Sequence, residues 1–434
     1  MAFYLANNGI LRKKDGSIII NTSDCIKITT IDVGYGDAIL CQTKNKNILF
    51  DVGASTQREK FFTALQQYGV STIDHLFITH PHSDHFGNFP YMLGRATTSG
   101  AFPVNIKNVY TSGLNITYYL NTASLQTASI GTWSLATEEQ KTNASIVAKA
   151  FKNVPYTYTV QSNGLKKVTG QKAADYFSAQ GLNISDWTSL EGACQLNSEY
   201  MLSNNIPHYI VNPTISGGRI QPITINLGDS VSFHAYWPTE DYVTESRQVI
   251  IGSYALNEIG YRNTAGDEYG HGTDVNNTSI LGKLIYKNFS MLITGDCSAT
   301  INGRVSKRIN AQDNLLQNTN SSELHCTIYK SCHHGHTTEN PQNWIQAIHP
   351  QTEIISTGKS TTKADPNGIK GNPDRPGLTA ATLAGVNKTA IFSTRHHGDI
   401  TVFTDGNGYV VKPQRENSEW FDEWVNESIL PEST

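Results

Sequence analysis

The stretch Thr79–Asn88, with the sequence Thr-His-Pro-His-Ser-Asp-His-Phe-Gly-Asn, is the part of this chain that decides its fold. It follows the short, mainly apolar run Ile73–Ile78, which the pattern predicts to be a buried strand. Three imidazoles and one carboxylate within six residues cannot all turn inward from a regular helix or strand. A loop wrapped around a cation can use them all, so the stretch predicts a metal site at the end of the strand.

The order of these side chains favours two neighbouring ions over one. We expect His80 and His82 to project to one side of the loop, and Asp84 and His85 to project to the other. Each pair would then contribute to a different ion.

The pattern His-x-His-x-Asp-His on a loop that ends a strand resembles the metallo-β-lactamase superfamily. The resemblance implies an α/β fold, a four-layer αβ/βα sandwich, with an insertion between the metal motifs. It also implies two divalent ions, with Zn²⁺ expected and Mn²⁺ as the alternative. Asp51, which closes the run Ile48–Phe50, matches the superfamily's first motif, and by this resemblance it braces the metal loop through hydrogen bonds.

A second group of motifs supplies the remaining ligands by the same resemblance. Asp296 ends an apolar run with Thr-Gly-Asp and fits the residue that bridges both ions. The run that starts at Thr327 then ends in three further imidazoles, at His333, His334 and His336. We take His333 as the last ligand and His334 as its alternative, because the sequence alone does not tell which ring faces inward.

Four motifs together resemble one branch of the superfamily: Asp-Val-Gly-Tyr-Gly-Asp-Ala at 32–38, Asn-Asn-Thr-Ser at 276–279, Thr-Gly-Asp at 294–296 and Lys-Ser-Cys-His-His-Gly at 330–335. They are similar to the hydrolase domain of ComEC-type competence proteins and to the catalytic module of bacterial phosphorylcholine esterases. The resemblance covers roughly residues 25–113 and 204–412.

The chain departs from its relatives at one ligand. Many superfamily members supply a third histidine to the first ion from the region before the Gly-Asp strand, whereas this chain has Asn276 and Asn277 there. Asn277 and the nearby His271 are the candidates for that third position. Without a third histidine the site would bind zinc more weakly and could admit manganese. Asn372 also stands where relatives often have a histidine.

Composition restricts the class of protein and its partners. The 434 residues are 38% hydrophobic and 16% charged, with a formal net charge of −4, so no global attraction to polyanions is expected. Six scattered cysteines give no disulfide framework, and Cys332 is expected to be a packing residue.

The sequence also bears on localisation. The start resembles no signal peptide, and no apolar run is long enough to span a bilayer. We therefore expect a soluble protein that is cytoplasmic by default, and the alternative is association with a virion or a cell surface.

The motifs also divide the chain into segments. We predict an N-terminal extension at 1–24, a hydrolase domain at 25–412 with an insertion at about 114–203, and a C-terminal tail at 413–434. The insertion is rich in aromatic side chains and is expected to lie over the active-site face.

The expected chemistry is hydrolysis of a phosphodiester. Two ions held by imidazoles and by Asp84 and Asp296 would lower the pKa of a bridging water and steady a phosphoryl oxygen. His334, His336 or Lys330 would protonate the leaving group or hold the phosphate. The expected substrate is a small head group or a wall polymer, such as phosphorylcholine on teichoic acid.

Two other classes of function remain open from the sequence. A competence-type nuclease is disfavoured by the acidic charge balance and by the lack of membrane segments. A non-catalytic structural or surface protein, for instance a phage component, would suit the polar composition, but the intact ligand set argues against it.

Overall fold

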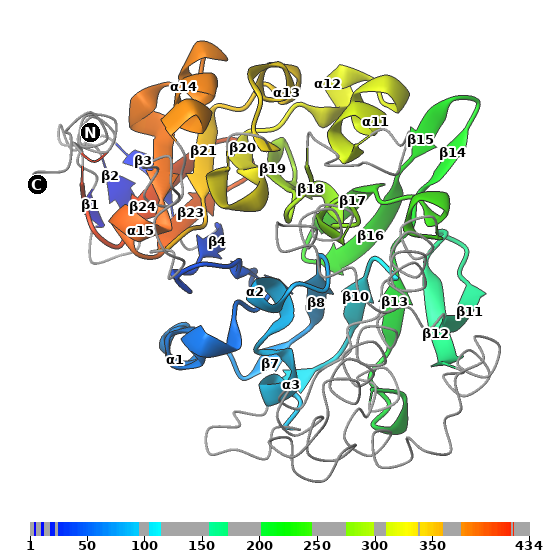
Figure 1. Cartoon of the computed structure of the whole chain (residues 1–434). Coiled ribbons are helices and arrows are strands. Elements are labelled where there is room, and N and C mark those ends of the chain that lie inside the picture. The colour runs from blue at the N-terminus through cyan, green and yellow to red at the C-terminus, as the bar shows by residue number, and fades with distance from the viewer. Residues whose placement is uncertain are drawn as a thin grey trace, which may run out of the picture.

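The computed structural model describes residues 4–5, 10–12, 18–21, 25–94, 104–113, 156–171, 201–244, 275–298, 310–336, 339–358, 375–417 and 420. Within these residues two large β-sheets face each other (Figure 1).

Ten of the described strands form the first sheet. Its order is β11-β12-β13-β10-β8-β6-β5-β4-β23-β24, and the strands pair in both parallel and antiparallel fashion. The bounds are β4 Ile26–Thr30, β5 Ile39–Gln42, β6 Asn47–Phe50, β8 His75–Ile78, β10 Val109–Thr111, β11 Tyr156–Val160, β12 Lys166–Gln171, β13 His208–Ile210, β23 Ile400–Thr404 and β24 Tyr409–Pro413.

Seven of the described strands form the second sheet, in the order β16-β17-β18-β19-β20-β21-β22. The strands from β16 to β19 pair in antiparallel fashion, and those from β19 to β22 pair in parallel fashion. The bounds are β16 Ile223–Gly228, β17 Val231–Trp237, β18 Leu281–Tyr286, β19 Phe289–Ile293, β20 Ile328–Lys330, β21 Thr352–Ile355 and β22 Ile391–Ser393.

The apolar core lies between the two sheets. Phe50 and Phe77 of the first sheet stack with ring centroids 4.6 Å apart, and Phe233 of the second sheet contacts both rings at 5.1 and 5.0 Å. Side chains alternate along a strand, so Phe50 faces this core while Leu49 faces outward into a second apolar cluster. This alternation is what allows each sheet to carry helices on its outer face.

Helices cover both outer faces. The helices α1 (Arg58–Gln67), α2 (Ser83–Phe86) and α3 (Phe89–Met92) pack on the first sheet, and α11 (Ala311–Asn318), α12 (Ser321–Leu324), α13 (Gln342–Ile348) and α14 (Arg375–Leu383) pack on the second. Figure 1 shows the two sets on opposite sides of the molecule. The predicted four-layer α/β sandwich is confirmed.

Parallel pairing places the sequence motifs at one end of the sandwich. Phe50 is the register partner of Phe77, so the residues that follow β6 and β8 leave the first sheet at the same edge. In the second sheet β19, β20 and β21 are parallel neighbours, and the segments after β19 and β20 also leave at a common edge. The two sheets therefore bring these loops together. The carboxyl ends of parallel strands are also where α/β proteins usually bind their ligands.

The remaining described strands extend the sandwich. Strands β1 (Tyr4–Leu5), β2 (Ile10–Arg12) and β3 (Ile18–Asn21) form a small antiparallel sheet. Within the predicted insertion, β11 and β12 form a hairpin that joins the first sheet through β13, so this part continues a sheet edge. Two short pairs, β7 (Thr72–Ile73) with β9 (Asn105–Ile106) and β14 (Thr214–Ser216) with β15 (Arg219–Gln221), complete the strands.

Every helix in the described part of the chain is too short or too polar to cross a bilayer.

Candidate metal centre

Asp51 holds the histidine loop by three contacts. The residue follows β6 with a left-handed backbone (φ 57°) and is 1% exposed. Its carboxylate accepts hydrogen bonds from the Thr79 amide and the Thr79 hydroxyl, each at 2.7 Å. It also lies 2.8 Å from Nδ1 of His85, so His85 donates Nδ1–H to it. Asp51 thus fixes both ends of the loop and leaves Nε2 of His85 as the free nitrogen.

Local sequence determines how the loop presents its ligands. Pro81 disfavours helical backbone at His80, and the chain bends at these two residues before His82, which is extended with φ −88° and ψ 148°. The short helix α2 then begins at Ser83 and places Asp84 and His85 in a single turn. The first two imidazoles are therefore presented from non-helical chain, and the other two groups from a helical turn.

The tautomer of His80 follows from its neighbours. Nδ1 of His80 lies 3.1 Å from both the Thr79 and the Ser279 hydroxyl oxygens. The Thr79 hydroxyl already donates to Asp51, so it can only accept from His80. His80 therefore carries its proton on Nδ1 and directs the lone pair of Nε2 into the site.

The second histidine segment is a strained turn. His333, His334 and Gly335 all have positive φ, at 44°, 55° and 84°. Asn340 stabilises the turn by donating to the carbonyls of Cys332 and His336, at 2.9 and 2.6 Å. Consecutive left-handed residues cost free energy, and such strain is typical of functional sites.

This turn buries His334 and leaves His333 at the rim. His334 is fully buried and donates Nδ1–H to the Ser356 carbonyl at 3.0 Å, which leaves Nε2 free, 3.2 Å from Oδ2 of Asp84. The side chain of His333 is 24% exposed, with Nδ1 3.5 Å from Glu339. The ring of His336 lies 4.7 Å from that of His333.

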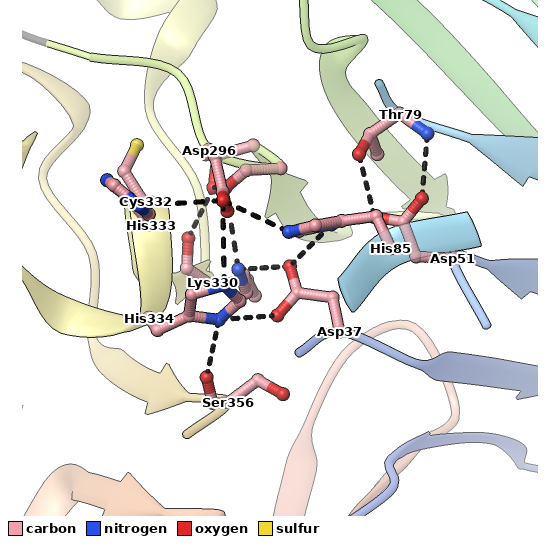
Figure 2. A network of polar contacts seen from close by, with 12 residues as sticks. Asp37, Asp51, Thr79, His85, Asp296, Lys330, Cys332, His333, His334 and Ser356 are labelled. Atoms are coloured by element: carbon pink, nitrogen blue, oxygen red, sulfur yellow. Dashed lines mark hydrogen bonds and ion pairs between the residues drawn. The ribbon is translucent and has the colours of Figure 1, made fainter. Parts of the chain in front are cut away.

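Four imidazoles converge on one oxygen atom. The Nε2 atoms of His85, His334, His80 and His333 lie 3.0, 3.5, 3.8 and 3.8 Å from Oδ2 of Asp296. Figure 2 shows Asp296 between the histidine loop and the His333–His334 turn. A carboxylate oxygen approached by imidazoles from loops of both sheets has a geometry in which one residue could bridge two ions.

The described residues contain two sets of side chains close enough to hold an ion. One set is His80, His82 and Asp296, and the other is Asp37, His85, Asp296 and His334. Each donor atom of either set lies within 4.8 Å of the other donors in that set. His80 and His82 fall in one set and His85 in the other. Asp84, which was predicted to lie with His85, belongs to neither set, and its Oδ2 lies 3.2 Å from Nε2 of His334.

The donor set fits divalent cations. Nε2 of His80, Nε2 of His85 and Oδ1 of Asp296 are buried and lack a hydrogen-bond partner among the described residues. Buried polar atoms without partners are costly, and one ion in each of the two sets would satisfy all three. Neutral imidazoles with carboxylates are ligands that Zn²⁺ and Mn²⁺ both accept.

The charges within the site are strongly coupled. Burial raises the pKa of Asp296, but the neighbouring His85 and His334 outweigh it and hold that pKa well below its usual range. Burial lowers the pKa of His85, yet Asp296 and Asp51 reverse the effect and raise it. Burial also lowers the pKa of His80. Asp296 is therefore ionised, and a cation bound by His85 would replace a proton on that imidazole.

The candidates for a third ligand of the first ion have different positions. Oδ1 of Asn277 accepts hydrogen bonds from the amides of Ala311 and Ser298, at 2.9 and 3.2 Å, so its amide oxygen is occupied by the backbone. This geometry does not support the expectation that Asn277 is a ligand. The amide oxygen of Asn276 is buried and without a partner in the described part of the chain. His271 and Asn372 lie outside the described residues.

Lys330 cannot reach a substrate. Its side chain is fully buried, contacts the carboxylate of Asp37, and donates to the Gly295 carbonyl at 3.4 Å. Burial lowers the pKa of Lys330, but Asp37 and Asp296 outweigh it and raise that pKa, so the ammonium keeps its charge. Cys332 is fully buried and its thiol lies 3.4 Å from the Gln312 amide, consistent with a packing role.

The sequence interpretation missed Asp37 and Asn340 as parts of the site. Asp37 lies in the motif Gly-Tyr-Gly-Asp at 34–37, which was used only to recognise the branch. An acidic residue after two glycines, directly before a strand, was the signal available for it. Asn340 has no sequence signal, because its role depends on the strained turn that it stabilises.

One comparison with known proteins gives a family match over part of the chain. Residues 31–119, which include the histidine loop, match the family model described as the metallo-beta-lactamase superfamily. No curated protein matches the sequence.

Three solved structures illustrate how distant the structural relatives are. The metallo-beta-lactamase fold protein YhfI from Bacillus subtilis is 9% identical, with a TM-score of 0.37, over 86% of this chain and 98% of its own. Igni18, a metallo hydrolase from Ignicoccus hospitalis, is 10% identical, with a TM-score of 0.34, over 88% and 98%. Human tRNase Z, short form, is 12% identical, with a TM-score of 0.32, over 76% and 93%. Likeness at this level carries no argument about activity.

Proposed function

Because this chain has the fold of the metallo-β-lactamase superfamily and matches the superfamily's model over residues 31–119, we propose that it is a dinuclear metal-dependent hydrolase of phosphodiesters. Members of the superfamily are generally metal-dependent hydrolases. One observation carries the proposal: the Nε2 atoms of His80, His85 and His334 lie within 3.8 Å of Oδ2 of Asp296, each on a ring whose Nδ1 is held by an oxygen acceptor.

The proposal assigns the ligands as follows. His80, His82 and Asp296 would hold the first ion, with Asn276 as the nearby amide candidate. His85, Asp296 and His334 would hold the second ion together with Asp84, which contacts His334, while Asp37 of the same set is paired with Lys330. His334 takes the place given to His333 in the sequence interpretation, because its free nitrogen faces Asp84 from a fully buried ring. A pair of divalent ions held there would polarise a phosphoryl oxygen and lower the pKa of a bound water.

The chain's own residues would orient the substrate. His333 is partly exposed with Nε2 3.8 Å from Oδ2 of Asp296, and His336 is partly exposed with its ring 4.7 Å from that of His333. These two imidazoles would hold a phosphate oxygen or protonate a leaving group. Glu339 lies 3.5 Å from Nδ1 of His333 and would orient that ring. Tyr35, with its ring 4.4 Å from that of His334, adds an aromatic wall to the same side.

The preference for phosphodiesters rests on the motif order that resembles ComEC-type and phosphorylcholine-esterase modules.

Hydrolysis can be measured with p-nitrophenyl-phosphorylcholine, bis-p-nitrophenyl phosphate and single-stranded DNA, each with Zn²⁺, with Mn²⁺ and after treatment with EDTA. Turnover of the choline ester or the bis-ester, lost with EDTA and in the Asp296→Asn variant, is the expected result.

The same panel separates the other classes. Turnover of DNA alone would favour the competence-type nuclease. No turnover of any substrate by protein that has bound metal would contradict the proposal and favour a non-catalytic role.

A further inference from the structure

Tyr35 carries a phenol hydroxyl at the open side of the candidate metal centre. The centroid of its ring lies 4.4 Å from that of His334, and the two ring planes are tilted by 50°. Figure 2 shows His334 between Asp296 and Ser356. His334 is fully buried whereas Tyr35 is only partly buried, so the phenol covers the imidazole on its solvent side.

The Tyr35 hydroxyl makes no hydrogen bond with any residue that the structure describes. Burial raises the pKa of this hydroxyl. The charged groups that act on it are, in order of effect, His334, Asp84, Asp296 and Glu339. Three of these groups are proposed ligands, and Glu339 lies beside the partly exposed His333. The hydroxyl therefore lies among the groups of the centre, with its hydrogen-bonding capacity unused by the protein.

The turn that carries Tyr35 is held by close contacts from both sheets. Gly36, directly after it, has φ 135°, and a Cβ there would lie 2.4 Å from the Asp84 carbonyl oxygen. On the other side, a Cβ on Gly358 would lie 2.6 Å from the Tyr35 amide nitrogen. The Ser356 hydroxyl also donates to the Gly36 carbonyl at 2.8 Å. These contacts fix the backbone that presents the phenol, as is required of a group that orients a substrate.

We propose that Tyr35 is a substrate-contacting residue whose hydroxyl donates a hydrogen bond to a non-bridging oxygen of the phosphodiester. The inference rests on the hydrolase function proposed above and adds a residue that binds its substrate. Ionised carboxylates can only accept hydrogen bonds, and so can phosphoryl oxygens, so the donor must come from another group. A phenol has an ordinary pKa of about 10 and keeps its proton at neutral pH. Hydrogen bonds to a charged oxygen are among the stronger ones in proteins.

Tyr35→Phe tests the proposal, because it removes the hydroxyl and keeps the ring that covers His334. Methylphosphonate is a suitable probe, since it offers phosphoryl oxygens without a hydrolysable ester and does not absorb in the near ultraviolet. Calorimetric titration into the Zn²⁺-loaded protein measures its affinity. The near-ultraviolet difference spectrum reports whether a tyrosine hydroxyl begins to donate when the probe binds.

We expect Tyr35→Phe to bind as many zinc ions as the wild type and to bind methylphosphonate roughly 10- to 100-fold more weakly. The tyrosine difference band that methylphosphonate produces in the wild type should be absent from this variant. The kcat/KM for p-nitrophenyl-phosphorylcholine should fall in the same range.

Tyr68→Phe is the matched control. The Tyr68 hydroxyl donates to Asp399 at 2.6 Å and contacts none of the proposed ligands. Tyr68→Phe should lower the urea midpoint of unfolding and leave methylphosphonate binding unchanged. Tyr35→Phe should do the opposite, because the Tyr35 hydroxyl has no partner among the described residues to lose.

Equal affinity for methylphosphonate in the wild type and Tyr35→Phe would overturn the inference, and so would loss of a zinc ion in that variant. Failure of the zinc-loaded wild type to bind methylphosphonate would overturn it as well. None of these results would by itself contradict the proposed hydrolase function, which the substrate panel above tests separately. A wild type that takes up no ion would overturn both.

Discussion

Nε2 of His85 lies 3.0 Å from Oδ2 of Asp296, although the two residues follow strands of different sheets. The contact forms because Asp51 fixes the opposite nitrogen of the ring at 2.8 Å and because parallel strands end at a common edge. Each of these supports can be tested separately.

Asp51→Asn should weaken metal binding without changing the ligands. The amide cannot accept from Nδ1–H of His85 and from both Thr79 donors together, so the ring and the loop lose their fixed orientation. We expect roughly 10- to 100-fold weaker Zn²⁺ binding, measured by competition with a chromogenic chelator. Asp399→Asn is the control, since that carboxylate accepts from the Asp32 amide and the Tyr68 hydroxyl and contacts none of the proposed ligands. Equal weakening in both variants would argue against a specific brace.

His334→Gln and His333→Gln should differ in metal content. His334 is buried with its free nitrogen beside Asp84, whereas His333 is partly exposed. Elemental analysis of purified His334→Gln should give one ion per chain, and its activity should fall by more than the roughly 10- to 100-fold cost of losing an outer partner. His333→Gln should keep two ions and lose activity only. If His333→Gln lost one ion and His334→Gln kept both, His333 would be the ligand and this prediction would be wrong.

Gly36→Ala should disrupt the site through a steric contact. A Cβ at Gly36 would lie 2.4 Å from the Asp84 carbonyl, and its φ of +135° is unfavourable for any side chain. Gly69→Ala is the matched control, because its φ is +68° and nothing lies within 4 Å of the added atom. Gly69→Ala should cost about 1–2 kcal/mol of unfolding free energy, and Gly36→Ala should cost clearly more and also weaken metal binding. Equal effects in urea unfolding would show that Gly36 does not support Asp84.

Glu353 predicts a pH dependence of stability that is separate from the metal site. Burial raises the pKa of this carboxyl from 4.5 to about 7, and the Ser331 hydroxyl only partly offsets the effect. A raised carboxyl pKa contributes stability below pH 4.5 that is lost as the pH rises through 7. The unfolding free energy of the wild type should therefore fall, relative to Glu353→Gln, by about 2 kcal/mol between pH 5.5 and 8. Urea unfolding of both proteins across this range measures the difference, and parallel curves would contradict it.

The local parts of the fold and site could be predicted from the sequence. The strand before Thr79 and the apolar alternation around Phe50 specify a buried sheet, and the residues that follow them specify its edge. The loop from His80 to His85 keeps four candidate ligands within one short segment, so its spacing alone was enough to predict a metal site.

The parts that depend on distant packing could not be predicted. The choice between His333 and His334 depends on two consecutive left-handed residues stabilised by Asn340, which no residue pattern specifies. The position of Asp37 depends on Lys330, which approaches it from the other sheet. Both outcomes are determined by how the sheets meet, and the sequence pattern of a single strand contains no information on that.

The most direct test of the central claim is anomalous diffraction at the zinc edge from crystals grown with Zn²⁺. The account predicts two peaks per chain that share Asp296, one beside His80 and His82 and the other beside Asp84, His85 and His334. Well-ordered crystals with these side chains in place and no anomalous peak between them would contradict it.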